Sequence, residues 1–519
     1  MDFDVVIIGS GFGGAICAAR LAEAGYRAVV LERGRRWKVE EYPRAPDDAW
    51  TWDHEHPEKK HGWFDFRVFP HMTVVQGAGV GGGSLVYANI SIEAKPDTFN
   101  EGWPPEITFP ALAPHYNRVG ETMNVRMVPP GQWPARTRLL KEAADSLGYG
   151  DRFRPLELAV TFDEHWTYHQ PDPFNPAKSK PVVNAQGQQQ GTCVHLGECD
   201  IGCPVRARNT LDLNYIPIAE QHQAVVKALH IVRRIKPMAG GYEVSYQEIR
   251  NGALIPGTMT GRIVIVAAGS LGSTELLLHC RKDPGALPKL SARLGRGWSS
   301  NGDFLTPAIH AGRDVDPSRG PTITAAVDLL DGAYDGQPVF IEDGGFPNVA
   351  ESQLRRLAEQ PGRDDHEKAL IATARLLVNA GVLRSVMPWF AQSRDAADGQ
   401  LSLKNDKLFL AWNSRKSKKT IDAVVSLHQQ MALRTGGLPL TPLTWSTCGD
   451  LVTPHPLGGC NMATSADKGV VDHKGEVFGY KNLYVADGAI IPKAIGRNPS
   501  RTIGALAERI ASLIVAEHR

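Results

Sequence analysis

The sequence lacks several features, and each absence narrows what the protein can do. It carries no excess of one charge, because 57 basic and 56 acidic residues give a formal net charge of +1 over 519 residues. Proteins that bind nucleic acid or an anionic membrane surface usually present a basic patch, so we expect neither partner. No run of about 18 uncharged apolar residues occurs, so no membrane span is predicted.

Cysteine is scarce, and nothing near the first residue has the pattern of a targeting signal. Asp2 and Asp4 stand where a secretory signal would be cationic, so we expect none. Four of the seven cysteines are scattered singly, which is typical of a reducing compartment where disulfides are rare. We therefore expect a cytoplasmic protein. Its length predicts two or three domains.

The opening segment FDVVIIGSGFGGAICAARLAEAGYRAVVLERG has the pattern of a dinucleotide-binding βαβ unit. It predicts a strand over Asp4 to Ile8, a helix over Ala15 to Ala24 and a second strand over Arg27 to Leu31. The G-x-G-x-x-G glycines between the first strand and the helix are Gly9, Gly11 and Gly14. Such glycines let the backbone approach a pyrophosphate at the helix N-terminus. Glu32, 18 residues after Gly14, is placed to accept hydrogen bonds from a ribose. This motif alone does not separate FAD from NAD.

Three later segments add to this pattern. Residues 76–90, QGAGVGGGSLVYANI, form a glycine-rich stretch between apolar residues, and such a bare loop can lie flat against a large planar ligand. Residues 261–278, GRIVIVAAGSLGSTELLL, predict a buried strand, a turn of small residues and a helix. Residues 482–492, NLYVADGAIIP, predict a strand that ends at Asp487-Gly488, and a long C-terminal helix follows.

Together with HPLGGC at residues 455–460, these motifs resemble the glucose–methanol–choline (GMC) oxidoreductase family, and its cholesterol-oxidase-like branch in particular. The resemblance implies an α/β fold, in which an FAD-binding Rossmann-like domain of the p-hydroxybenzoate-hydroxylase type interleaves with a substrate domain on a mainly antiparallel sheet. The implied FAD-binding segments are 1–40, 70–110, 205–312 and 455–519. The implied substrate domain and lid comprise 41–69, 111–204 and 313–454, with a cysteine-rich loop at 191–204.

The resemblance also implies which residues form the site. His455 and Asn498 match the family's active-site pair beside the flavin N5, and Glu342 resembles a catalytic glutamate, although a core or loop-capping role is equally open for it. The implied ADP-binding residues are Gly9, Gly11, Gly14 and Glu32. The implied flavin and phosphate contacts are Gly79, Gly82, Gly83, Ser84, Asp487 and Gly488. No histidine adjoins the glycine loop at the position used for covalent attachment, so we expect non-covalent FAD.

The chemistry of alcohol oxidation suits these residue types. A hydride leaves a carbinol carbon readily only when a base takes the hydroxyl proton, and His455 is such a base. The Asn498 amide can donate a hydrogen bond to the same oxygen. Pro499 suits the first turn of the terminal helix, whose N-terminus would stabilise an anionic reduced flavin.

Three cysteines lie close together in the stretch GTCVHLGECDIGCPVRARNT. Cys193, Cys199 and Cys203 have the spacing C-x5-C-x3-C, and Pro204 follows. Three interpretations are open. A zinc site would want a fourth ligand, for which the spacing of His195 is awkward. An iron–sulfur centre, most simply a [3Fe-4S] cluster, would fit three thiolates followed by proline. The third interpretation is three reduced structural cysteines. Of the three we favour the cluster, with Cys193, Cys199 and Cys203 as its ligands.

The leading hypothesis is an FAD-dependent enzyme that oxidises a hydrophobic, sterol- or terpenoid-like alcohol. A cluster would pass electrons to an external protein or quinone, whereas an enzyme without one would use oxygen. A non-redox lyase or isomerase on the same fold is a further alternative. We also expect residues 42–70 to form a lid or a partner surface, and MPWFAQ at 387–392 to line the pocket.

Overall fold

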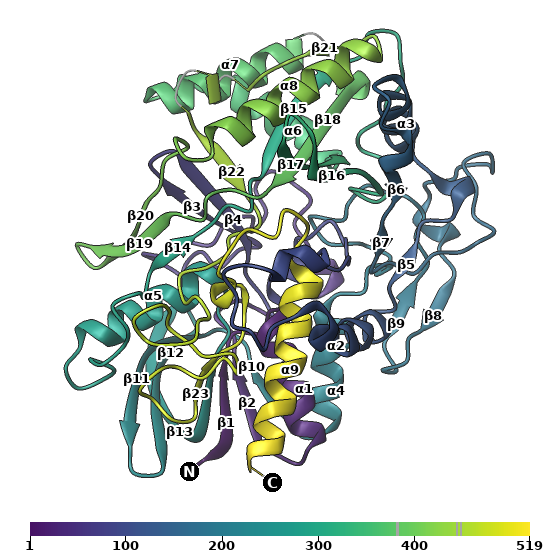
Figure 1. The fold of residues 1–519 in the computed structure, drawn as a ribbon. Helices are drawn as coiled ribbons and strands as arrows, with labels where there is room; N and C mark the ends of the chain where they lie inside the picture. The colour runs from purple at the N-terminus through teal and green to yellow at the C-terminus, as the bar shows by residue number, and fades with distance from the viewer. Residues whose placement is uncertain (380–382, 443–444, 447–448, 519) are drawn as a thin grey trace.

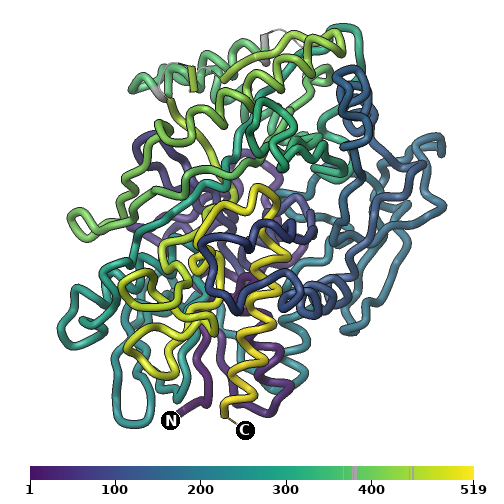
Figure 2. Tube along the Cα trace, in the orientation of Figure 1, coloured from purple at the N-terminus to yellow at the C-terminus, as the bar shows by residue number. Residues whose placement is uncertain are grey.

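The computed structural model describes residues 1–379, 383–442, 445–446 and 449–518. Two large sheets dominate it, one at each end of the molecule (Figure 1). Both chain termini lie at the lower end in Figure 2, where the purple N-terminal, teal and yellow C-terminal segments come together. The chain therefore leaves this end of the molecule and returns to it. No helix in the described ranges is long and apolar enough to cross a membrane.

The lower sheet has seven strands and is parallel on one side. Its order is β10 (Val225–Lys227), β2 (Ala28–Leu31), β1 (Phe3–Ile8), β13 (Ala253–Val266), β12 (Gly241–Arg250) and β11 (His230–Met238), while β23 (Leu483–Val485) also pairs with β13. Strand β13 changes partners along its length, because it is antiparallel to β12 over its first part and parallel to β1 from Gly261. The buried apolar runs of β1 and β2 are typical of parallel strands covered on both faces.

Helices cover this sheet and join distant parts of the chain. They are α1 (Phe12–Glu23), α2 (Phe109–Thr122), α4 (Tyr215–Gln221), α5 (Gly269–Lys282) and α9 (Ser500–His518). Helix α9 packs against α1 and α2 (Figure 1). Its fully buried Glu508 accepts hydrogen bonds from Arg20 of α1 and from the Tyr215 hydroxyl of α4. This buried charge is therefore paired, as a buried carboxylate must be.

Helix α1 begins three residues earlier than the sequence pattern indicates, at Phe12. The helix therefore begins inside the glycine motif. A Cβ at Gly14 would lie 2.0 Å from the carbonyl oxygen of Gly9, so only glycine allows the first turn to approach β1 this closely.

The upper sheet has six strands, and every neighbouring pair in it is antiparallel. Its order is β21 (Leu438–Pro439), β15 (Phe304–Ile309), β18 (Val386–Ser393), β17 (Gln337–Asp343), β16 (Ala325–Tyr334) and β6 (Phe153–Pro155). This confirms the predicted fold class. Strand β15 lies within 205–312, which the resemblance assigns to FAD binding, so a boundary at 312 separates β15 from its sheet partners.

Within the described residues, four helices lie beside the upper sheet, and four small sheets complete the fold. The helices are α3 (Ala135–Ser146), α6 (Val349–Ala358), α7 (Asp365–Asn379) and α8 (Lys418–Arg434). One small sheet joins β22 (Leu451–Thr453), β4 (Met72–Gly77) and β3 (Phe64–Phe69), and another joins β14 (Arg296–Trp298), β19 (Gly399–Lys404) and β20 (Lys407–Ala411). The two-stranded sheets pair β5 (Arg126–Met127) with β7 (Glu157–Leu158), and β8 (Pro181–Val183) with β9 (Gln189–Gly191). Helix α8 packs against β15 and β17, and α7 packs on α6 (Figure 1).

Candidate active site

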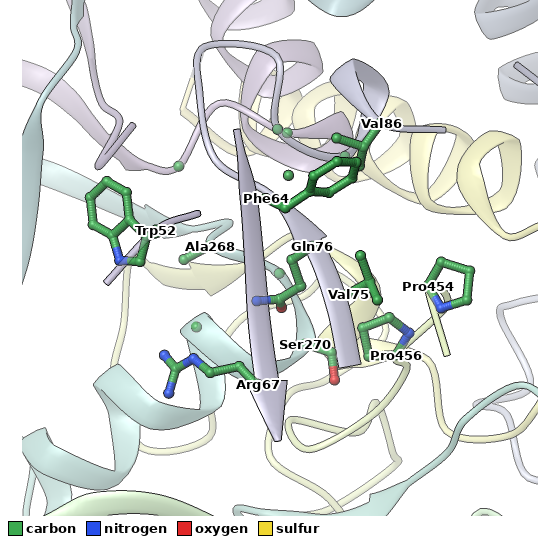
Figure 3. A pocket seen from close by; sticks show the side chains of 18 of the residues that line it. Trp52, Phe64, Arg67, Val75, Gln76, Val86, Ala268, Ser270, Pro454 and Pro456 are labelled. Atoms are coloured by element: carbon green, nitrogen blue, oxygen red, sulfur yellow. The ribbon is translucent and has the colours of Figure 1, made fainter. Parts of the chain in front are cut away.

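A large cavity of about 1270 Å³ connects the predicted nucleotide motif with His455 and Asn498. Figure 3 shows part of its wall, with Phe64 and Arg67 from β3, Val75 and Gln76 from β4, and Pro454 and Pro456, which flank His455 in the chain. Cavities that hold one small ligand usually measure roughly 300–1,000 Å³. This cavity therefore has room for a large cofactor together with a substrate.

The nucleotide end of the cavity is formed by the glycine motif after β1. Gly9, Gly11 and Gly13 line the cavity, whereas Gly14 packs against β1 as described above. Gly9 has a φ of 98°, and a Cβ there would lie 2.3 Å from the carbonyl oxygen of Ala267. Two of the three predicted glycines thus face the cavity, and the third sets the distance between helix and strand.

Glu32 lies at the end of β2, as predicted, and its carboxylate lines the cavity. Its Oε2 accepts hydrogen bonds from the backbone N–H and the hydroxyl of Ser10, at 3.0 and 2.7 Å. Its Oε1 accepts one from the Gly34 N–H at 2.8 Å. A carboxylate has about four acceptor positions. One position therefore remains for a ligand hydroxyl, as ribose recognition requires.

The second glycine-rich stretch follows β4 and touches the first one. Gly82 and Gly83 line the cavity, and Gly82 has a φ of 51°. A Cβ at Gly82 would lie 2.6 Å from the Cα of Gly11, so the two loops can meet only as glycines. Gly79 and Ser84 do not line the cavity. A Cβ at Gly79 would lie 2.6 Å from the Trp37 ring, and the Ser84 hydroxyl donates to the Gly81 carbonyl oxygen.

Arg208 holds this loop, and the sequence pattern does not point to it. The buried guanidinium donates to the carbonyl oxygens of Ser84, Leu85 and Tyr87 and to Oδ1 of Asn89. These acceptors stand more than a hundred residues earlier in the chain, so no local signal could have identified the residue.

Asp487 and Gly488 both line the cavity, at the end of β23. The Asp487 carboxylate already accepts hydrogen bonds from the N–H groups of Gly269 and Ala489 and from the Ser273 hydroxyl. It therefore fixes the start of α5 against β23. Burial raises its pKa, although these hydrogen bonds oppose the rise. A direct contact with a ligand phosphate or ribityl chain stays a prediction.

The His455 imidazole is oriented by a buried carboxylate. Its Nδ1 lies 3.0 Å from both oxygens of Asp303, which also accepts a hydrogen bond from the Thr453 hydroxyl at 2.6 Å. Because Nδ1 donates to the carboxylate, the neutral ring carries its free lone pair on Nε2. No described residue forms a hydrogen bond with Nε2, and the ring lines the cavity. His455 is thus arranged to accept a proton there.

Asn498 lies beside the N-terminus of α9 and lines the same cavity. Its Oδ1 is buried and has no hydrogen-bond partner among the described residues. A buried polar atom without a partner is costly, and a ligand or an ordered water that enters the cavity can supply the missing hydrogen bond. Pro499 and Ser500 also line the cavity, so the start of the helix faces the space that would hold the flavin.

Glu342 lies behind these two side chains and does not line the cavity. On β17 it pairs with Phe390 of β18, whose ring centroid lies 6.2 Å from that of His455, so Glu342 is on the face directed toward the site. Burial, together with the charges of Asp343 and Asp303, raises its pKa well above the usual range, and the Asn498 amide opposes the rise. The structure thus brings Glu342, Asn498 and His455 into one group, in which burial favours the neutral form of Glu342.

The three clustered cysteines line a second, much smaller cavity of about 20 Å³. Burial raises the pKa of all three thiols. The described residues contain no group of three or more histidine, cysteine or acidic side chains arranged to hold a metal ion. A space of this size holds about one water molecule. A cluster of three irons and four sulfides does not fit the arrangement, so the structure does not support the predicted ligand role of Cys193, Cys199 and Cys203.

The predicted lid and pocket segments contribute several wall residues. From 42–70, Trp52, His54 and Glu55 line the cavity, and Glu55 forms an ion pair with Lys407 of β20. Most of this stretch lacks regular structure, but its end forms β3. From MPWFAQ, Phe390 lines the cavity.

Comparisons with known proteins agree with this site. The family model "GMC oxidoreductase" matches residues 397–507, and that of an "NAD(P)-binding Rossmann-like domain" matches residues 7–47. The chain is 30% identical to a cholesterol oxidase of Acinetobacter baumannii, over 100% of this chain and 95% of that protein. It is also 30% identical to a cholesterol oxidase of Mycobacterium tuberculosis, over 99% and 91%. A long-chain-alcohol oxidase of Arabidopsis thaliana is 23% identical, over 99% of this chain and 67% of that protein.

Among solved structures, pyridoxine 4-oxidase from Mesorbium loti superposes with a TM-score of 0.66 at 18% identity, over 99% of this chain and 100% of that one. The chain belongs to the GMC oxidoreductase family, and it is an FAD-dependent oxidoreductase that acts on CH–OH groups. The residues present fit FAD, because they supply the glycine cradle, the spare acceptor of Glu32 and the unpaired amide oxygen of Asn498.

Proposed function

We propose that the protein oxidises the carbinol of a bulky hydrophobic alcohol, sterol- or terpenoid-like, and that it binds FAD non-covalently and returns the electrons to oxygen. The observation that carries this proposal is the position of His455 and Asn498 in a cavity large enough for cofactor and substrate together. Beyond them the wall is largely apolar, with Ile201, Leu305, Ile323, Pro347, Phe390 and Val452. Relatives that cover nearly the whole chain are named cholesterol oxidases.

The chain's own residues manage the hydroxyl proton. Nε2 of His455 accepts it, and the Asp303 carboxylate stabilises the resulting imidazolium, because it already binds Nδ1. The Asn498 side chain orients the substrate oxygen through its amide. Burial raises the pKa of Glu342 and so favours its neutral form, which would place no negative charge beside the Asn498 amide.

FAD, when bound, supplies the acceptor for the hydride that leaves the carbinol carbon. The residues that would hold it are the two glycine loops, with Gly9, Gly11, Gly82 and Gly83, and the carboxylate of Glu32. The start of α9 would present backbone N–H groups and its positive dipole end to the ring system.

Oxygen is the proposed final acceptor because the space among the thiols is too small for a cluster. One observation favours the alternative, in which a [3Fe-4S] cluster passes electrons to a protein or quinone. All three thiols line the same small cavity. An assay of iron and acid-labile sulfide, with an EPR spectrum of the same anaerobically prepared sample, separates the two acceptors.

The test of the proposed function is anaerobic titration of the FAD-bound protein with hydrophobic secondary alcohols. Oxidation of the carbinol should bleach the oxidised flavin in proportion to the ketone formed, and admission of oxygen should restore the colour with one peroxide per ketone. If no alcohol bleaches the flavin, alcohol oxidation is wrong and a non-redox lyase or isomerase becomes the better hypothesis.

A further inference from the structure

One carboxylate of the main cavity lacks the partners that the others have. Six acidic side chains line the cavity within the described part of the chain, and five have a cation or backbone N–H groups as partners. These five are Glu32 with Ser10 and Gly34, Glu55 with Lys407, Glu275 with Arg67, Asp406 with Lys282, and Asp487 with Gly269 and Ala489. The sixth is Asp200.

Asp200 has a single weak hydrogen bond through its side chain. Its Oδ1 lies 3.3 Å from the Thr322 hydroxyl, and Oδ2 has no hydrogen bond or ion pair with any described residue. The backbone is nevertheless fixed, because the Trp63 indole N–H donates to the Asp200 carbonyl oxygen at 3.1 Å. The backbone of Asp200 is therefore held in place, and the side chain, at the wall of the cavity, has acceptor capacity that no described residue uses.

The charged groups nearest to Asp200 are already engaged elsewhere. Arg208 donates to the glycine loop, and Arg136 donates to five carbonyl oxygens, among them those of Thr322 and Gly344. Burial raises the pKa of Asp200 to about 6, while Arg208, Thr322 and Arg136 oppose the rise. The Asp200 carboxylate therefore has no cation committed to it and can accept a hydrogen bond from a donor that enters the cavity.

Asp200 stands apart from the His455 group but within reach of the same ligand. None of the groups that shift its pKa belongs to that group. Its hydrogen-bond partner Thr322 lies four residues before Ala326, which pairs with Glu342 across two strands. Four extended residues span at most about 14 Å, so the backbones of Thr322 and Ala326 are no further apart than this. Ile201, which follows Asp200 in the chain, and Ile323, which follows Thr322, also line the cavity. A rigid multi-ring alcohol can span such a distance.

We propose that Asp200 is a specificity-determining residue that accepts a hydrogen bond from a second donor group, a hydroxyl or an amine, at the end of the substrate remote from the oxidised carbinol. This inference rests on the proposed function. It narrows the substrate class from a purely apolar alcohol to one with a polar group at each end.

The test compares three alcohols on one rigid skeleton. They carry no remote group, a remote hydroxyl or a remote amine, and kcat/KM is measured for each through anaerobic flavin reduction. We expect the wild-type protein to prefer a donor-bearing alcohol by about 10- to 100-fold, since hydrogen bonds to charged groups are worth about 1.5–3 kcal/mol. Asp200→Leu should abolish the preference. Asp200→Asn, which keeps an acceptor but no charge, should retain part of a hydroxyl preference and lose an amine preference.

Glu198→Gln is the matched control, because Glu198 lies two residues away and does not line the main cavity. It should leave all three kcat/KM values unchanged. FAD content and thermal stability, measured for every variant, verify folding. The inference is overturned if the wild-type protein reduces flavin with all three alcohols equally well, or if the Asp200 variants slow all three by one common factor. Failure of the wild-type protein to reduce flavin with any alcohol would instead contradict the proposed function.

Discussion

The main cavity and the cysteine cavity differ in what their polar groups still lack. In the main cavity, Nε2 of His455, Oδ1 of Asn498 and the Asp200 carboxylate have acceptor capacity that no described residue uses. In the cysteine cavity, backbone N–H groups of His195 and Ala207 already donate to the sulfurs of Cys193 and Cys203 at 3.4 Å. The main cavity therefore has hydrogen-bond acceptors without partners, whereas two of the three sulfurs in the cysteine cavity already accept hydrogen bonds from the backbone.

This difference shows that clustered reactive side chains alone do not identify a functional site. The cysteines stand out in the sequence because they are close together, yet the space among them measures only about 20 Å³, and two of the sulfurs already accept backbone hydrogen bonds. The hydrogen-bond acceptors without partners in the main cavity point more strongly to a ligand than the clustered thiols do. The following experiments test this difference between the two cavities.

The largest expected effect is on the proton acceptor of the main cavity. His455→Ala should lower the rate of flavin reduction by about 10²–10⁴-fold with FAD still bound, because general-base catalysis contributes about that much. Asp303→Asn should act in the same direction, since it removes the carboxylate that binds Nδ1. Stopped-flow reduction under anaerobic conditions measures both. A loss of less than tenfold for His455→Ala would mean that another group accepts the proton.

The second effect is on the loop that would hold the flavin. Arg208→Ala should destabilise the protein by about 3 kcal/mol or more and weaken FAD binding, because several buried acceptors lose their donor at once. Urea unfolding and FAD dissociation measure these losses. The control Arg36→Ala removes an exposed ion pair with Glu220 and should cost at most about 1 kcal/mol. Equal costs for the two variants would contradict the role of Arg208.

A third, intermediate effect concerns Glu342, the buried acid whose pKa is raised. Because the folded-state pKa of Glu342 lies above the unfolded value, the folded protein binds more protons once pH exceeds about 4.5. Stability is then lost as pH rises toward the folded-state pKa, by up to about 1.4 kcal/mol per pH unit. Glu342→Gln should remove this slope, so its stability relative to the wild-type protein should increase from pH 5 to pH 8. Urea unfolding across this range would contradict the prediction if the two slopes were the same.

Much of the architecture could be predicted from local sequence, whereas His455 and Asn498 were expected only from the resemblance to the family. The βαβ unit and the glycines that face the cavity belong to short motifs whose chemistry depends on neighbours in the chain, and His455 and Asn498 stand in short motifs that carry the resemblance. The residues that support His455 and the second glycine loop lie outside these motifs. Asp303 lies 152 residues from His455, and Arg208 lies 124 residues from Ser84, so only the fold brings these pairs together.

Asp200 and the cysteines show that closeness in the sequence is also a poor guide to which residues share a site. They are neighbours in the sequence, but Asp200 faces the main cavity, whereas the thiols face the small one. The exposure of a side chain to one cavity or another depends on backbone turns such as the left-handed residues His195 and Gly202, and spacing alone does not report these turns. The predicted ligand set followed the spacing and was not supported for that reason.

The smallest expected effect concerns the cysteines themselves. Cys199→Ser replaces a thiol in the small cavity with a hydroxyl of similar shape, and we expect flavin reduction to stay within about twofold of the wild-type rate, because the mechanism proposed here involves none of the three sulfurs. Iron and acid-labile sulfide should be absent from both proteins, and their EPR spectra should be silent. A stoichiometric signal in the wild-type protein that disappears in the variant would show that the loop opens to hold a cluster, and the contrast between the two cavities would then no longer hold.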